Sequence, residues 1–244
     1  VYMKRGRLLI LAVLILLLLR PAISTFTLIE TAVDTSSGDI QILKVAKAPL
    51  GPGEPDTIIM AGHMLSPAGT KDKAFIFFAN EADPSTTVKS LMNWDLLGRG
   101  YQFTDMEVVD LDGDDLKEII VTANFNYNTT DPTNVTSQVI VFNRELSVVK
   151  QLNWTHDGRM TYTTSLHVAD IEISSTTLEI LVGGYYLPVA ADEKRPFLKI
   201  LTKELELFDG SIPVTTWDEN TTVSDLDVKN LYEEAIGTKE VVVA

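Results

Sequence analysis

The chain contains no cysteine among its 244 residues, which excludes a disulfide framework, a thiol nucleophile and a Cys-ligated zinc site. Basic residues are also few, because 20 Lys and Arg stand against 34 Asp and Glu, for a formal net charge of −14. Nucleic-acid binding needs a basic surface, so we expect no nucleic-acid partner. The composition, 45% hydrophobic and 22% charged, indicates a folded chain and not a disordered one.

Histidine is scarce as well, and each of the three residues has a structural explanation. His63 follows an apolar run, His156 lies in a Trp-containing turn, and His167 alternates with apolar neighbours. No H-E-x-x-H, G-x-S-x-G or phosphate-loop motif occurs in the sequence. Acid pairs for glycoside chemistry are defined by their separation in space, and the sequence singles none out. We therefore predict that the protein is not an enzyme.

Long apolar runs are absent except at the N-terminus. Three basic residues precede twelve apolar residues at positions 8–19, and small residues follow at Ala22 and Ser24. This order is typical of a secretory signal peptide, which we place at residues 1–24 with cleavage after Ser24. The run is shorter than the roughly 20 residues that span a bilayer. We predict a secreted or cell-surface protein, which would contact the membrane only if this segment stays uncleaved as an anchor.

Glycosylation sequons agree with export. The pattern N-x-[ST] occurs four times, at Asn128, Asn134, Asn153 and Asn220. We therefore expect a glycoprotein, although coincidental matches in a Thr-rich chain are the alternative explanation.

The sequence repeats with a period of 61 residues. An acidic residue followed by three apolar ones occurs at 118–121, 179–182 and 240–243, and Thr-Ile-Ile-Met stands one period earlier at 57–60. Short runs rich in Val, Ile and Phe flank each segment, separated by clusters of Gly, Asp, Asn, Ser or Pro. Each unit is therefore predicted to form four short strands.

Four strands in each tandem unit of this length are typical of a β-propeller blade. We predict an all-β propeller of four-stranded blades at about 36–95, 96–157 and 158–218, with a partial blade at 219–244. Each repeated apolar segment would be an inner strand, buried on both faces by neighbouring blades. Residues 25–244 hold three to four units, so we expect an incomplete propeller. A closed four-bladed ring, a β-helix and tandem sandwiches are the alternatives.

The most acidic stretch, DLDGDDLKE at residues 110–118, directly precedes one of these inner strands. Its oxygen ligands suit a hard cation such as Ca²⁺, and Gly113 permits the turn between them. Asp115 and Val121 stand where an EF-hand requires Gly and Glu, so the loop is not of that type. A solvated acidic turn without metal is the alternative. The predicted metal ligands are Asp110, Asp112, Asp114, the backbone carbonyl of Leu116, and Glu118.

Asp-x-Asp-Gly-Asp-x-x-x-Glu followed by Ile-Ile-Val, within a blade-length repeat, resembles the FG-GAP/VCBS family of calcium-loop propellers, related to the integrin α-subunit head. The resemblance covers roughly residues 36–244 and implies one Ca²⁺ bound by the same five residues. Asp115 departs from the family, which usually has Gly there. The sequences beginning at Asp170 and Asp225 look like degenerate loops, so we expect a single calcium ion.

These features together predict an exported calcium-binding β-propeller that acts as a cell-surface binding or adhesion module for a protein or glycan. The alternatives are a calcium-dependent, lyase-like enzyme acting on polysaccharides and a structural envelope protein. A fold supports many functions, so the fold class does not choose among them.

Overall fold

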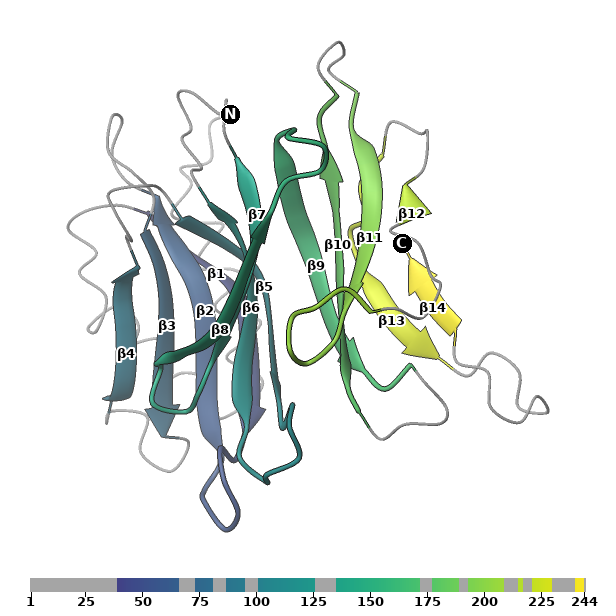
Figure 1. Cartoon of the computed structure of the whole chain (residues 1–244). Helices are drawn as coiled ribbons and strands as arrows, with labels where there is room; N and C mark the ends of the chain where they lie inside the picture. Colours follow the sequence, from purple (N-terminus) through teal and green to yellow (C-terminus); the bar gives the residue numbers. More distant parts are fainter. Residues whose placement is uncertain are drawn as a thin grey trace, which may run out of the picture.

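The computed structural model describes residues 39–65, 73–80, 87–94, 101–125, 135–171, 177–188, 193–208, 215–216, 221–229 and 240–243. Within these residues every helix or strand assigned is a β-strand, and no helix could cross a membrane. The strands form three four-stranded sheets and one two-stranded sheet (Figure 1). The prediction of an all-β chain with four-stranded units is confirmed for the first three units. The predicted signal peptide at 1–24 and the sequons at Asn128, Asn134 and Asn220 lie outside the described residues.

Each sheet is built from strands that are consecutive in the sequence, and neighbouring strands pair antiparallel. The first sheet contains β1 (Asp39–Ala48), β2 (Thr57–Leu65), β3 (Lys73–Asn80) and β4 (Thr87–Trp94). The second contains β5 (Tyr101–Val109), β6 (Glu118–Phe125), β7 (Thr136–Phe142) and β8 (Val148–Trp154). The third contains β9 (Thr161–Ala169), β10 (Glu179–Tyr186), β11 (Arg195–Leu201) and β12 (Thr215–Thr216). The last pairs β13 (Leu226–Lys229) with β14 (Glu240–Val243).

The backbone repeats with the same 61-residue period as the sequence. The strands β2, β6, β10 and β14 begin at residues 57, 118, 179 and 240, one period apart. The pairing of β1 with β2 shifts register between Ile42 and Lys44, and the pairing of β5 with β6 shifts between Phe103 and Asp105, again one period further on. Bulges of this kind increase the local twist of a strand pair. The repeat therefore preserves irregular features as well as strand starts.

Strand β6 is buried on both faces because a sheet lies on either side of it. Ile119 and Val121 belong to one buried cluster with Ile59 of the first sheet, whereas Ile120 belongs to another with Ile180 of the third sheet. Successive side chains of a strand point to opposite faces, so a strand between two sheets is apolar at every position. The prediction that this strand is buried on both faces is confirmed.

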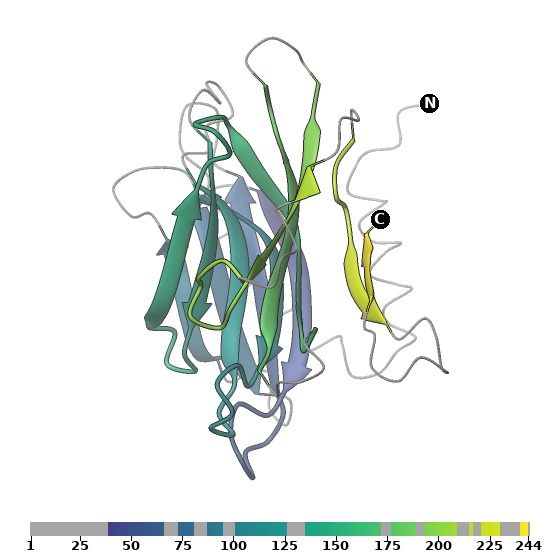
Figure 2. The same ribbon diagram turned by 45° about the vertical axis from the view of Figure 1, so that its right-hand side comes forward.

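The first strands of successive sheets contact one another, from β1 to β5, from β5 to β9 and from β9 to β13. The two-stranded sheet lies beyond the third sheet, on the side away from the first (Figures 1 and 2). Leu181 of β10 and Ile200 of β11 share a buried cluster with Val223 and Leu226. The third sheet is therefore covered on its second face by the segment 221–229.

The prediction that Asp225 and Asp227 begin a degenerate acidic loop is wrong. Leu226–Lys229 forms strand β13, which pairs with β14, and the Leu226 side chain is buried. The Asp-x-Asp pattern here reflects the alternation of a strand, in which polar side chains flank a buried leucine. The 61-residue period also indicates that Asp227 is a strand residue, since it lies two periods after Asp105, which belongs to β5.

Candidate metal centre

The acidic loop connects β5 to β6 and is folded around the carboxylate of Asp110. Its Oδ1 accepts hydrogen bonds from Gly113 N at 2.7 Å and Asp114 N at 3.1 Å, and its Oδ2 accepts one from Asp115 N at 2.9 Å. Gly113 and Asp115 have positive φ angles of 84° and 68°. Asp adopts this left-handed conformation more readily than most residues, so Asp115 is accommodated in place of the glycine that the resemblance leads one to expect.

Asp110, Asp112 and Glu118 each place one carboxylate oxygen within 4.8 Å of the others. Glu118 Oε2 accepts a hydrogen bond from Leu111 N at 2.9 Å, which holds the side chain against the loop that precedes it. Asp110 and Glu118 are partly buried, and Asp112 is exposed. Hard cations such as Ca²⁺ take carboxylate oxygens of this kind, so the chemistry of this donor set fits the predicted ion.

Asp114, the fourth carboxylate among the predicted ligands, is not part of this group of three, and the fifth predicted ligand is the backbone carbonyl of Leu116. Asp114 Oδ1 accepts a hydrogen bond from Leu116 N at 2.8 Å, within the loop itself. Lys117 N donates to Leu50 O at 3.0 Å, in the corresponding loop of the first sheet. The backbone around Leu116 is therefore held by contacts on both sides, next to the three carboxylates that the structure brings together.

The electrostatics of the loop favour a cation. Burial raises the pKa of Glu118, and repulsion from Asp112, Asp114 and Asp110 raises it further, against the opposing hydrogen bond from Leu111 N. A carboxylate under this repulsion gains from a bound positive charge more than an isolated one would. Among the described residues, no second group of three acidic or histidine side chains comes as close together.

The described residues on either side of the corresponding loop of the third sheet are joined in a related way. Glu179 is buried, and its Oε2 accepts a hydrogen bond from Ile171 N at 2.9 Å, as Glu118 does from Leu111 N. Its Oε1 accepts a hydrogen bond from Thr177 Oγ1 at 3.1 Å. The glutamate that begins each of these inner strands thus also has a structural role, independent of any ion.

Sequence reasoning missed a set of polar contacts between the second and third sheets. Strand β9 is an edge strand, and the amides on its outer side have no strand to pair with. Asp105 Oδ2 accepts a hydrogen bond from Leu166 N at 3.0 Å, and Glu107 Oε2 accepts one from Val168 N at 2.9 Å. In both hydrogen bonds the donor residue follows the acceptor residue by 61 residues, so the repeat period is the feature of the sequence from which these contacts could have been predicted. We call these two carboxylates, with the two amides, the inter-sheet clasp.

Two basic side chains complete the inter-sheet clasp. Lys44 Nζ lies 2.9 Å from Asp105 Oδ1, and His167 Nδ1 lies 2.9 Å from Glu107 Oε1. Three sheets therefore meet through these side chains, because Lys44 belongs to β1, the two acids to β5 and His167 to β9. The hydrogen bond and the charge of Glu107 raise the pKa of His167, and Asp227 and Asp225 add to this effect.

This raised pKa predicts how stability depends on pH. His167 binds its proton more tightly in the folded chain, so its contribution to stability is complete below the unfolded-state pKa of about 6.5. The contribution is then lost as the pH rises through the higher folded-state value. We expect the free energy of unfolding to fall over this range, and to fall less in His167→Gln. Denaturant titrations at several pH values check this, and parallel curves for the two proteins would contradict it.

Comparison with known proteins adds little to these observations. No protein-family model matches the chain, and no curated protein matches it. Among solved structures, it is similar to a Bacillus licheniformis rhamnogalacturonan lyase PL11 at 11% identity and a TM-score of 0.30. The similarity covers 72% of this chain and 43% of that chain, so the chain spans less than half of the enzyme's length. A likeness at this level supports no statement about activity.

Proposed function

We propose that the protein is a calcium-binding β-propeller module of the FG-GAP/VCBS type, exported from the cell, which binds a protein or glycan at the cell surface. The observation that carries this proposal is the convergence of Asp110, Asp112 and Glu118 in a loop that leads directly into a buried strand. These three side chains would hold the ion, with Asp114 and the carbonyl of Leu116 as the remaining ligands.

The propeller arrangement is supported by the way the sheets follow one another. Each four-stranded sheet is a meander, its first strand contacts the first strand of the next sheet, and corresponding positions are one repeat period apart. Blades that stack around an axis place their first strands together in this manner. The blades would occupy about 36–95, 96–157 and 158–218, with a further part at 219–244.

In this proposal the ion has a structural role. Bound Ca²⁺ would neutralise the loop carboxylates and so fix a segment that also contacts the neighbouring sheet through Lys117 N and Leu50 O. A rigid framework of this kind positions the surfaces that bind a ligand, and binding surfaces are commonly carried by loops on such scaffolds.

Calorimetric titration with Ca²⁺ tests the proposal. We expect one Ca²⁺ to bind each chain, and we expect Asp112→Asn or Glu118→Gln to weaken binding at least tenfold through the loss of one charged ligand. Mg²⁺ serves as the control ion, because it demands a tighter octahedral site and should bind more weakly. A folded protein that gives no binding heat with Ca²⁺, or that binds Mg²⁺ equally well, would refute the proposed site.

A further inference from the structure

Aromatic and cationic side chains gather on one face of the third sheet, toward the end of β10. Tyr186 pairs with Arg195 across β10 and β11, and Val182 pairs with Lys199, so these side chains share a face. Val182 packs with residues of the second sheet, which shows that this face is turned toward that sheet. Phe197 stands between Arg195 and Lys199 on the same face.

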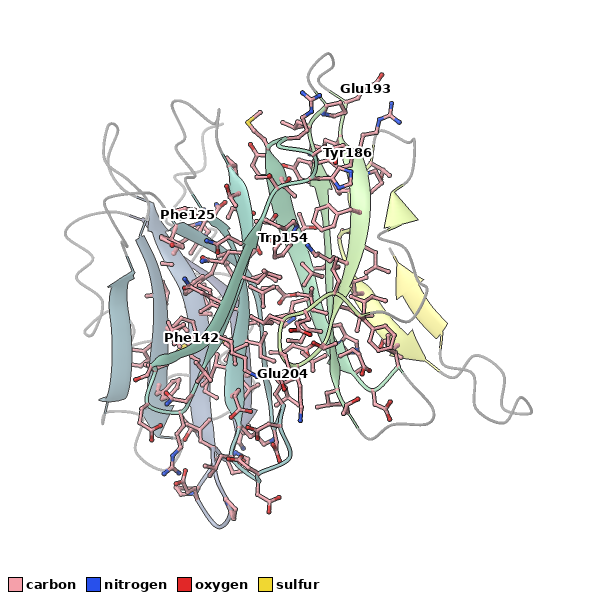
Figure 3. All side chains as sticks on the ribbon, in the orientation of Figure 1. Phe125, Phe142, Trp154, Tyr186, Glu193 and Glu204 are labelled. Atoms are coloured by element: carbon pink, nitrogen blue, oxygen red, sulfur yellow. The ribbon has the colours of Figure 1, made fainter. Side chains whose placement is uncertain are left out.

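The end of the second sheet adds two further rings. Trp154, the last residue of β8, meets Phe197 edge-on, with ring centroids 6.4 Å apart and an interplanar angle of 88°. His156 lies against Tyr186 with ring centroids 4.0 Å apart. Figure 3 shows Trp154 nearer the middle of the molecule and Tyr186 nearer the end marked by Glu193. We call this set the aromatic–cationic face: Trp154, His156, Tyr186, Arg195, Phe197 and Lys199.

The backbone holds this arrangement in place. The turn after His156 closes with a hydrogen bond of 2.8 Å from Arg159 N to His156 O, and Asp157 and Gly158 have positive φ angles of 49° and 71°. Leu187 N donates to Met160 O at 3.0 Å, which ties the turn to the end of β10. The rings of the aromatic–cationic face are therefore positioned before any ligand arrives, which lowers the entropic cost of binding.

Lys199 is the unusual member of this face. Its Nζ lies 4.6 Å from the centroid of the Trp154 ring, and no described carboxylate forms an ion pair with it. In a chain with a net charge of −14, it is notable that a partly buried lysine faces a ring and no carboxylate among the described residues, since partial burial lowers its pKa. A ring face attracts a cation more weakly than a carboxylate does. An anionic ligand would supply the missing partner.

Two further hydrogen-bond donors accompany Lys199. Neither the indole N–H of Trp154 nor the hydroxyl of Tyr186 hydrogen-bonds to a described residue. The face thus combines apolar ring surface with donors and a cation. The complementary ligand has an apolar face of its own, several hydroxyl oxygens and a carboxylate. A sugar acid has all three features.

We propose that the aromatic–cationic face binds an acidic sugar unit of a glycan, with its carboxylate at Lys199 and its ring against Trp154 and Tyr186. This inference names the ligand class for the binding role proposed above and rests on that role. It does not rest on the calcium ion, because the two sites lie at opposite ends of the strands. The acidic loop precedes β6 at the end where β10 also begins, whereas Tyr186 ends β10.

Calorimetric titration with an oligogalacturonate, and with a neutral galactose oligomer of equal length, tests the inference. The protein is first loaded with Ca²⁺ and freed of excess ion, because the carboxylates of the probe also bind free Ca²⁺. We expect binding of the acidic oligomer only. Lys199→Met keeps the stem of the side chain but removes its charge, and should weaken binding about tenfold or more. Trp154→Phe keeps a ring beside Phe197, removes the indole N–H, and should weaken binding as well.

Lys47→Met is the matched control, because Lys47 forms an ion pair with Asp56 in the first sheet and does not belong to the aromatic–cationic face. The affinity of this variant for the acidic oligomer should be unchanged. Three results would overturn the inference: no binding by the folded protein, equal affinity for the neutral oligomer, or unchanged affinity in Lys199→Met. Binding that chelation abolishes, while Lys199→Met leaves it intact, would place the glycan at the acidic loop and also refute this site. Oligogalacturonate binding by a protein that binds no Ca²⁺ would support the face and refute only the proposed metal site.

Discussion

Replacing Asp112 with alanine is expected to reduce the rise in Tm that Ca²⁺ produces in the unmodified protein by about half or more, because binding should weaken at least tenfold. An ion that binds only the folded state at 100 times its Kd stabilises that state by about 2.7 kcal/mol. For a chain of this size, 1 kcal/mol corresponds to roughly 2–4 °C, so the rise should be roughly 5–11 °C. Thermal unfolding of both proteins, with saturating Ca²⁺ and with a chelator, measures the effect.

The Asp112→Ala variant isolates the effect of the ion, because Asp112 contributes little to the stability of the fold itself. Its side chain is exposed, and no described residue hydrogen-bonds to its carboxylate. The alanine variant should therefore unfold at the temperature of the unmodified protein when a chelator is present. Glu206→Ala, which removes an exposed acid outside the acidic loop, is the control and should keep the full Ca²⁺ response. Equal Tm values for the unmodified protein with and without Ca²⁺ would rule out the calcium site.

Ile119→Ala and Ile120→Ala should each destabilise the protein by about 2–5 kcal/mol, the usual cost of removing most of a buried isoleucine side chain. The two residues are neighbours on β6, both are fully buried, and they pack against different sheets. A sheet with one solvent-facing side would give one large effect and one small one, because adjacent residues point to opposite faces. Chemical denaturation of the two variants therefore tests the stacking of three sheets.

Val149→Ala supplies the comparison for these variants. Val149 lies on the edge strand β8 and is 52% exposed, so its truncation should cost well under about 1 kcal/mol. If either isoleucine variant behaved like this control, strand β6 would not be enclosed on both faces.

The repeated apolar segments allowed the central strands to be predicted from sequence. Residues 119–121 and 180–182 are all apolar, which distinguishes a strand enclosed by two sheets from a strand at a surface, where apolar and polar residues alternate. The carboxylates of the acidic loop were predictable for a related reason, since ligands supplied by one short loop appear at regular spacing in the sequence. Both features are formed by residues that are close together in the sequence, so they can be predicted from the sequence pattern alone.

The inter-sheet clasp and the aromatic–cationic face were not predicted, because their members come together only when the sheets pack. Asp105 and Glu107 look like ordinary outward-facing residues of an alternating strand, and nothing nearby indicates that the next sheet lies against them. Trp154 and Lys199 belong to different sheets and meet where the second sheet packs against the third. Asp227 shows the converse, because its local resemblance to the acidic loop predicted a loop residue, whereas it lies in strand β13, two repeat periods after Asp105 of β5.

The inter-sheet clasp allows the folding of a sheet to be distinguished from its docking onto the neighbouring sheet. The amides of Leu166 and Val168 donate across a sheet boundary, outside the strand pairing of either sheet. The third sheet can form all of its own strand pairs while these two protons still exchange freely with solvent. Their protection from hydrogen exchange begins only when the second sheet docks, so they report association between repeats and not the folding of either one.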